Sequence, residues 1–318
     1  MPILHTFPRA TTASRNRLIG ASAAPTILGI SPWQTPFGLW LQMQGGDHGP
    51  PNAAMKRGTF LEPGILAWTA SEVGAVETEP GIPIDQPGIA GPEAWSSFHP
   101  DGALLMPSGD WRLAEIKTSR DASEWGESGT DSIPLHYLAQ VQYQLACTPG
   151  IAEAQVGVYL PMADELRCYV VATDAAFQRQ MLDLIGEWHH RHIVLGQAPE
   201  IDGSPAAAKF LRDRHPVQRG EIRTATDGEA LLLHELADVK ATIKAMEDRE
   251  ALLGAQIKAA IGDDEGLQVP GIGKATWRAV SGAERVDSKK LRAEYPAAAA
   301  ACTVRGDDRR DLRFWPAK

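Results

Sequence analysis

The sequence predicts a mixed α/β fold, in which helices flank a central sheet, followed by a C-terminal helical extension with a small β element. Two observations support this fold class. Residues 102–194 alternate between strand and helix patterns, whereas one long helical pattern dominates the chain after residue 195. At 318 residues the chain can hold a substantial core and more than one domain. We therefore expect a domain at 1–195, a linker with helical pieces at 196–223 and an extension at 224–318.

Three short helices are predicted ahead of the proline- and glycine-rich segment 76–96, and they span 22–28, 37–43 and 64–73. Ser22 is suited to cap the first helix, and Gly29 is suited to end it. Pro63 stands at the start of the third helix, where a first-turn proline loses no hydrogen bond. Within the proline-rich segment we expect short strands around 82–84.

The predicted sheet combines a hairpin with two later strands. Its strands are expected at 102–106, 111–117, 154–160 and 166–172. A glycine-containing turn at 107–110 joins the first two strands into the hairpin. The polar segment 121–132 predicts a loop, and residues 174–194 predict a helix that covers the sheet.

Residues 135–147 predict a helix with one apolar and one polar face. Its buried apolar face is formed by Leu138, Val141 and Leu145. Gln140 and Gln144 are four residues apart and therefore share an adjacent face of the same helix.

The extension begins with a capping box, in which Thr226 and Glu229 open a long helix that Gly262 ends. Its apolar residues follow heptad-like spacing, interrupted at Glu250: Leu232, Leu236, Val239, Ile243, Met246, Leu253 and Ile257. Because four heptads with one break make a short repeat, we favour a helix packed on its own chain over a self-associating coiled coil. A hairpin, a short helix and a last strand are expected at 267–280, 288–295 and 310–315.

The candidate site lies in the stretch FHPDGALLMPSGDWRLAEIKTS, residues 98–119. Glu115 and Lys117 are two residues apart on a predicted strand, so they point to the same side, while Ala114 and Ile116 point into the core. The hairpin would return Asp101 to the Glu115 end of its second strand. Two carboxylates and one ammonium suit a divalent cation and a phosphodiester. A surface hairpin with a solvated Glu–Lys pair is the alternative interpretation.

This stretch, PDG followed by EIK, resembles the core of the PD-(D/E)XK nucleases, and three further blocks resemble their YqaJ-type branch of phage recombinases, which includes lambda exonuclease. The further blocks are RNRLIGASAAPTILGISPWQTPFGLW at 15–40, RGTFLEP at 57–63 and IPLHYLAQVQYQLACTPG at 133–150. Four blocks in the family's order are far more specific than any one alone. The resemblance covers roughly residues 14–195 and implies a restriction-endonuclease-like core.

The resemblance also implies a role for each matching residue. Asp101 and Glu115 would be metal ligands, together with the backbone carbonyl of Ile116, and Glu62 would complete the acidic cluster. Lys117 would orient or activate the attacking water. The family's glutamine, which hydrogen-bonds the water or phosphate, matches Gln140, and His136 and Tyr137 are its neighbours.

A terminal 5′ phosphate would be held by Arg15 and Ser22, although Arg17 matches the arginine equally well by spacing. A guanidinium suits a phosphate monoester because it binds with two parallel hydrogen bonds.

As a whole, the resemblance implies an exonuclease that uses one or two Mg²⁺ ions, for which Mn²⁺ can substitute. It would resect linear double-stranded DNA ends from 5′ to 3′ and leave single-stranded tails for an annealing protein. The family further implies a homo-oligomer, with a trimeric ring as the model arrangement. Two alternatives stay open: a PD-(D/E)XK endonuclease, and a non-catalytic protein that binds DNA ends.

Charge and cysteine content are compatible with this interpretation. The net charge is −9, but basic side chains outnumber acidic ones before Glu62. The basic residues there are Arg9, Arg15, Arg17, Lys56 and Arg57, against Asp47 alone. A nuclease needs a local basic track and not a basic isoelectric point. Cys147, Cys168 and Cys302 are far apart and predict reduced thiols in a cytoplasmic protein, and no membrane span or secretory signal is indicated.

Two other motifs are interpreted as structural. PGIGKATW at 270–277 resembles a phosphate-binding loop, but Gln268 stands where that loop needs glycine and Ala275 where it needs Ser or Thr. The histidines His189, His190 and His192 lack a cysteine or carboxylate at ligand spacing.

Overall fold

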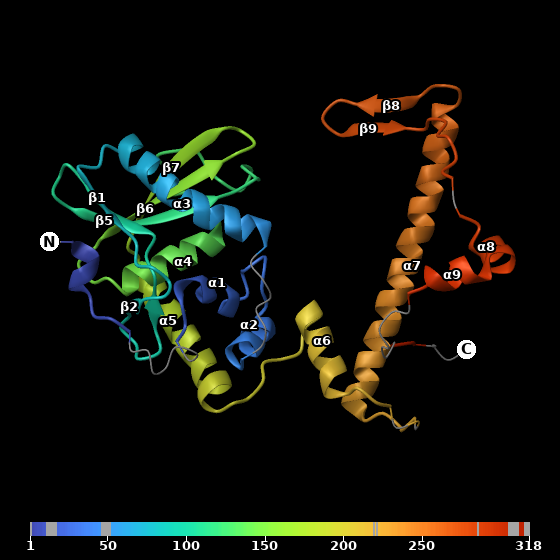
Figure 1. The fold of residues 1–318 in the computed structure, drawn as a ribbon, viewed down its shortest axis with the longest axis horizontal. Coiled ribbons are helices and arrows are strands. Elements are labelled where there is room, and N and C mark those ends of the chain that lie inside the picture. Colours follow the sequence, from blue (N-terminus) through green and yellow to red (C-terminus); the bar gives the residue numbers. More distant parts are fainter. Residues whose placement is uncertain are drawn as a thin grey trace. The chain divides into compact units, whose positions relative to one another are not determined.

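The computed structural model describes residues 2–10, 18–45, 52–218, 220, 222–284, 286–304 and 312–314. The chain divides into two compact units, Met1–Leu211 and Arg212–Lys318. The first unit contains the sheet and the helices around it, and the second contains a long helix with smaller elements (Figure 1).

The sheet of the first unit has five strands in the order β1 (Glu77–Pro80), β4 (Gly102–Leu105), β5 (Trp111–Thr118), β6 (Glu153–Leu160) and β7 (Glu165–Ala172). β5 and β6 are parallel, and all other neighbours are antiparallel. A parallel pair needs a crossover connection, which here contains helix α4 (Leu135–Ala146). The predicted mixed α/β fold with a flanked sheet is confirmed.

Helices cover both faces of this sheet. On one face, α3 (Ala53–Glu72) places Ile65 and Leu66 against Ala114 and Ile116 of β5. On the other face lie α4 and α5 (Ala175–His189), which bury a larger cluster of apolar side chains. Gly157 of β6 allows α3 to approach closely, because a Cβ at that position would lie 2.1 Å from Thr69 Oγ1. Both sides of the central strand β5 are therefore buried.

The remaining elements of the first unit are short. They are η1 (Ile3–Thr6), η3 (Ala21–Ala23), α1 (Ala24–Ile27), α2 (Pro36–Met43), β2 (Ile89–Ala90), β3 (Ser97–Phe98), η4 (His190–Val194) and α6 (Pro205–Arg214). Glu79 of β1 fixes η1, because both of its carboxylate oxygens accept from the Leu4 backbone N–H at 3.1 Å.

Three predictions in this unit are wrong. α3 begins at Ala53 and not at 64, because the Asn52 side chain caps it, so that Pro63 lies inside the helix. The prolines at positions 80, 83 and 87 flank or occupy the expected strand at 82–84, which lacks strand structure, and β1 forms earlier. Ser22 lies within the turn η3 and caps no helix, although Gly29 ends α1 as expected with a φ of 73°.

The second unit is built on α7 (Asp227–Ile261), with β8 (Gly266–Val269), β9 (Gly273–Thr276), α8 (Ser288–Glu294) and α9 (Pro296–Ala301). The capping box of Thr226 and Glu229 and the end of the helix at Gly262 are confirmed. β8 and β9 form the expected hairpin (Figure 1). The expected strand at 310–315 lies largely outside the described residues, and 312–314 carry no strand. No described helix is long and apolar enough to cross a membrane.

Candidate active site

Glu115 lies in the middle of the sheet and is held by three donors. Only 1 % of the residue is exposed. The amides of Gln140 and Gln144 on α4 each donate to one of its carboxylate oxygens at 2.6 Å. Lys117, two residues further along β5, donates to the oxygen that also accepts from Gln140. The predicted common side of Glu115 and Lys117 therefore faces α4 and is not solvated as a surface pair would be.

Asp101 immediately precedes β4, and the hairpin places it beside β5 as the spacing predicted. Its Oδ2 accepts from the backbone N–H of Ile116 at 2.8 Å. The backbone of Gly81 runs against it, so that a Cβ at position 81 would lie 2.2 Å from the carbonyl oxygen of Pro100. Burial and the charge of Glu115 raise the pKa of Asp101 well above its usual range, although Lys117 opposes this shift.

Lys117 carries the positive charge of the site. Burial opposes its charged form, but the carboxylates of Glu115 and Asp101 outweigh burial and raise the pKa of Lys117. It therefore stays protonated at neutral pH and acts as a donor and a charge. Its Nζ also lies 5.4 Å from the centre of the Tyr137 ring, within the range of a cation–π contact.

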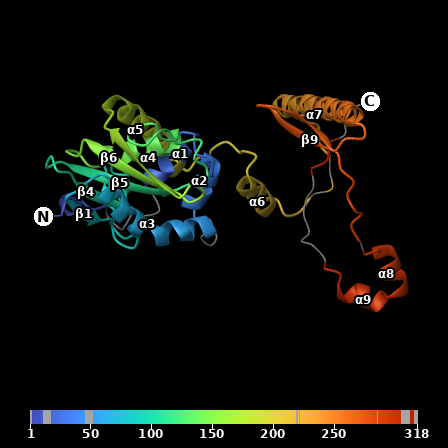
Figure 2. The ribbon, with the colours of Figure 1, turned by 90° about the horizontal axis from the view of Figure 1, so that it is seen from above.

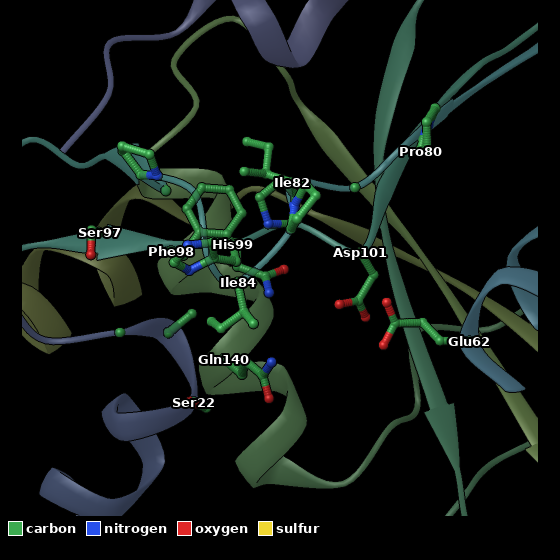
Figure 3. A pocket seen from close by; sticks show the side chains of 18 of the residues that line it. Ser22, Glu62, Pro80, Ile82, Ile84, Ser97, Phe98, His99, Asp101 and Gln140 are labelled. Atoms are coloured by element: carbon green, nitrogen blue, oxygen red, sulfur yellow. The ribbon is translucent and has the colours of Figure 1, made fainter. Parts of the chain in front are cut away.

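Glu62 reaches the site from α3, which lies on the face of the sheet opposite to α4. In Figure 3 its carboxylate and that of Asp101 point toward each other at one wall of a pocket. Burial raises the pKa of Glu62, with a further contribution from Glu115 that Lys117 opposes. The pocket has a volume of about 760 Å³, and its lining includes Ser22 and Gln140.

The donor types of this site fit Mg²⁺. Hard carboxylate and carbonyl oxygens are the ligands that Mg²⁺ takes in proteins. Within the described part of the chain, Glu62, Asp101 and Glu115 share the ammonium of Lys117, and three carboxylates against one ammonium leave an excess of negative charge that a divalent cation would offset. Among the described residues no three acidic, histidine or cysteine side chains converge as a preformed metal cluster.

An aromatic cluster, which sequence reasoning missed, borders the lysine side of the site. Tyr137 stacks on Trp125 with ring centres 5.3 Å apart and lies 5.7 Å from Trp33. His136 meets the edge of Trp33 at 4.8 Å, and burial lowers its pKa. His136 and Tyr137 thus neighbour the site as the resemblance implied. Trp33 and Trp125 lie far from them in sequence, and no local pattern signals the contact.

The second glutamine, Gln144, also gained a role that the sequence only hinted at. Its position four residues after Gln140 placed both on one face of the helix, but nothing in the sequence showed that both amides meet one carboxylate. The expected phosphate ligands Arg15 and Arg17 lie outside the described residues. Ser22 lines the pocket that Glu62 and Asp101 also line.

The two motifs set aside as structural have structural contacts here. The segment PGIGKATW forms the turn and second strand of the β8–β9 hairpin. His189 stacks on Trp95 with ring centres 5.7 Å apart, and the Nδ1 of His192 lies 2.6 Å from the Gln197 carbonyl oxygen. Cys147 and Cys168 are buried and Cys302 is exposed, and all three are free thiols.

Comparison with known proteins shows what this chain is similar to. The family model described as the YqaJ-like viral recombinase domain matches residues 12–150. The uncharacterized protein YqaJ of Bacillus subtilis (strain 168) is 25 % identical over 286 residues, which cover 89 % of this chain and 86 % of that protein.

Two solved structures are also similar, both of the alkaline exonuclease LHK-Exo from Laribacter hongkongensis. The structure in complex with dAMP has 22 % identity and a TM-score of 0.45. The other structure has 22 % identity and a TM-score of 0.44. Each match covers 64 % of this chain and 96 % of that one. The family model matches the segment that holds Glu62, Asp101, Glu115 and Gln140, so the resemblance inferred from the sequence is confirmed: residues 12–150 match the YqaJ-like viral recombinase domain.

Proposed function

We propose that this chain is a Mg²⁺-dependent deoxyribonuclease that hydrolyses phosphodiester bonds at the ends of linear double-stranded DNA. One observation carries the proposal. Glu115 is buried, accepts hydrogen bonds from Gln140, Gln144 and Lys117, and lies near the half-buried Asp101. A domain gains no stability from such an unbalanced set of buried charges, because each buried charge costs free energy unless it is paired.

The metal would be held by Asp101, Glu115 and the backbone carbonyl of Ile116, with Glu62 available for a second ion. Bound there, Mg²⁺ or Mn²⁺ supplies positive charge for the phosphate oxygens and lowers the pKa of a coordinated water.

The protein side chains divide the remaining work. Lys117 stays protonated, so it donates a hydrogen bond to the attacking water or to a phosphate oxygen and does not serve as the base. The amides of Gln140 and Gln144 hold the Glu115 carboxylate in one orientation. Because Gln140 also lines the pocket that Asp101 and Glu62 border, its side chain is available to a bound phosphate or water.

We further propose that digestion runs from 5′ to 3′ and produces single-stranded tails for annealing recombination. The description of the family as viral recombinases supports this role. A separate single-strand annealing protein would be the physiological partner. A terminal 5′ phosphate would contact Arg15 or Arg17 together with Ser22. In this proposal the enzyme is a homo-oligomer, for which the family suggests a trimeric ring.

Digestion of end-labelled linear duplex in Mg²⁺ tests this function. We expect release of 5′ nucleotides from linear duplex, loss of activity in EDTA, and no cutting of a covalently closed circle of the same sequence. Glu115→Gln and Lys117→Met should each abolish digestion while the far-ultraviolet circular dichroism is unchanged. Undiminished digestion by purified Glu115→Gln protein contradicts the assignment.

The phosphate preference is tested separately. We expect faster digestion of a 5′-phosphorylated end than of a 5′-hydroxyl end, and loss of this difference when Arg15 and Arg17 are both changed to alanine. If the double variant keeps the preference, the end-binding assignment is wrong even where the catalytic one is right. Equal cutting of the closed circle and the linear form would instead favour the endonuclease.

A further inference from the structure

The second unit, Arg212–Lys318, buries almost none of its apolar side chains. Among its described residues only Ile261 and Ala299 are buried apolar residues. Helix α7, 35 residues long, instead leaves its heptad positions exposed or half-exposed. We call these positions the α7 seam: Leu232, Leu236, Val239, Ile243, Met246, Glu250, Leu253 and Ile257. Since burial of apolar surface is the main driving force of folding, a unit without a core needs a partner for this seam.

We propose that the α7 seam pairs with the α7 seam of a second copy of this chain, as an antiparallel two-helix coiled coil. The seam positions follow one another at alternating intervals of four and three residues without a slip, which is the spacing that two supercoiled helices require. Figure 1 and Figure 2 draw α7 as one continuous helix, so the whole seam lies on a single element. The described residues of the second unit leave the seam uncovered.

The charge of α7 argues against DNA as the occupant of the seam. The helix carries seven acidic residues, Asp227, Glu229, Glu235, Asp238, Glu247, Asp248 and Glu250, against the four basic residues Lys240, Lys244, Arg249 and Lys258. A phosphate backbone is bound by an excess of basic side chains. An acidic helix with an apolar seam suits another helix of the same kind.

Glu250 decides the direction of the pair. In a parallel pair in register, the two Glu250 side chains would face each other in the seam, and like charges at that position repel. In an antiparallel pair with the whole seam overlapped, Ile243 lies opposite Met246 and Glu250 lies opposite Val239 of the second copy. The two glutamates are then three layers of the seam apart.

The residues that flank the seam complement one another in the antiparallel arrangement. Lys240 lies opposite Glu247 of the second copy, and the twofold symmetry makes this ion pair twice. Arg249 lies opposite Thr242 by the same geometry, so no like charges meet. Leu233 meets Gly254, where the absence of a side chain leaves room for the leucine.

The mass of the full-length protein in solution tests the pairing. Light scattering and sedimentation across a concentration series should show twice the mass of the unpaired species, with reversible dissociation on dilution. Ile243→Lys places a charge in the seam and should weaken association by roughly a hundredfold, because two buried isoleucines are lost per pair. Ala241→Lys, on the outer face of the same helix, is the matched control and should leave association unchanged.

Charge variants test the direction. Lys240→Glu should weaken association, and addition of Glu247→Lys in the same chain should restore it, because the ion pairs then re-form with the charges exchanged. In a parallel pair Lys240 would meet Glu235, so Glu247→Lys would restore nothing. Glu250→Leu should tighten association by about tenfold or more, because it completes the apolar seam.

Four outcomes overturn the proposal. A monomeric mass for both the natural protein and Glu250→Leu at 100 micromolar, where a pair with a dissociation constant of about 1 micromolar would be almost fully formed, excludes pairing. An equal effect of Ile243→Lys and Ala241→Lys excludes the seam as the interface. Failure of Glu247→Lys to restore association excludes the antiparallel direction. If the seam packs on the chain's own first unit, Glu250→Leu raises the melting temperature independently of concentration, which also excludes a second copy. None of these measurements depends on nuclease activity.

Discussion

At the scale of single residues, the described part of the site holds more carboxylates than positive charges. Among the described residues, Lys117 is the ammonium that Glu62, Asp101 and Glu115 share, and it donates to Glu115. Asp101 accepts one backbone hydrogen bond from Ile116, and burial, together with the charges of Glu115 and Glu62, raises its pKa. This imbalance has consequences for stability that can be measured without DNA.

We predict that Asp101→Asn abolishes digestion and raises the melting temperature in EDTA at neutral pH. A carboxyl group whose pKa is raised on folding ionises more easily in the unfolded chain. Its ionisation therefore destabilises the fold once the pH exceeds the pKa that the group has in the unfolded chain. The amide oxygen of Asn can still accept from Ile116. The stability difference between the variant and the natural protein should shrink as the pH falls toward about 4, where an unfolded aspartate takes up its proton.

Calorimetry across pH, with and without Mg²⁺, checks this prediction. Mg²⁺ should raise the melting temperature of the natural protein and have little effect on Asp101→Asn. Equal stabilisation of both proteins by Mg²⁺ would show that Asp101 does not bind the ion. A lower melting temperature for the variant in EDTA would contradict the charge imbalance.

The two amides on Glu115 give a second prediction. Gln144→Leu removes one donor from a carboxylate that is 1 % exposed, and we expect a loss of about 1–3 kcal/mol in the free energy of unfolding. Nuclease activity should fall by more than the loss of folded protein accounts for, because the Glu115 carboxylate loses its fixed orientation. Gln142→Leu, on the same helix, is the matched control, since Gln142 bonds the backbone of Ala172 and Asp174 and not the site. Comparable loss of activity in both variants would indicate a purely structural role.

At the scale of elements, α3 carries Glu62 one residue before a proline in the helix interior. Proline at position 63 has no N–H to donate to Thr59, and its ring displaces the backbone there. Packing of Ile65 and Leu66 on β5 stabilises the helix despite this missing hydrogen bond. We infer that the proline sets the direction of the Glu62 side chain.

Pro63→Ala should therefore raise the stability of α3 and lower nuclease activity. The gain is expected to be up to about 3 kcal/mol in the free energy of unfolding, from the restored hydrogen bond and the better helix former. Gly64→Ala is the matched control, because a Cβ there meets nothing within 4 Å and should stabilise the helix with activity unchanged. If Pro63→Ala keeps full activity, the orientation of Glu62 does not depend on the proline.

At the scale of the whole molecule, the hydrophobic core is confined to the first unit. Both core clusters end before residue 195, and α6 adds Phe210, which packs against Phe37 at 5.5 Å and Trp40 at 6.3 Å. We predict that a chain ending at Arg214 folds with the secondary structure of the first unit and keeps a cooperative melting transition. Circular dichroism and calorimetry check this. Loss of the transition would show that the second unit contributes to the core.

The sequence by itself determined the elements with strong local signals. The hairpin of β4 and β5, the strands β6 and β7, the capping box of α7 and its end at Gly262 follow from alternation, heptad spacing and capping chemistry. The PDG and EIK motifs placed Asp101, Glu115 and Lys117 on one hairpin, because the period of a strand fixes which side chains share a side. These rules act within a few residues, so one sequence suffices to apply them.

Only the tertiary structure decided which distant segments meet. Asn52 is a common type of capping residue, but nothing local predicts that α3 continues through Pro63, because packing against the sheet overrides the helix-breaking tendency of proline. Three other contacts likewise join segments separated by 25 residues or more. They are the hydrogen bonds of the two α4 amides to Glu115, the contact of Trp33 with Tyr137, and the approach of Glu62 to Asp101. Such contacts depend on how the layers pack. The burial that shifts the pKa values of the site exists only once those layers are in place.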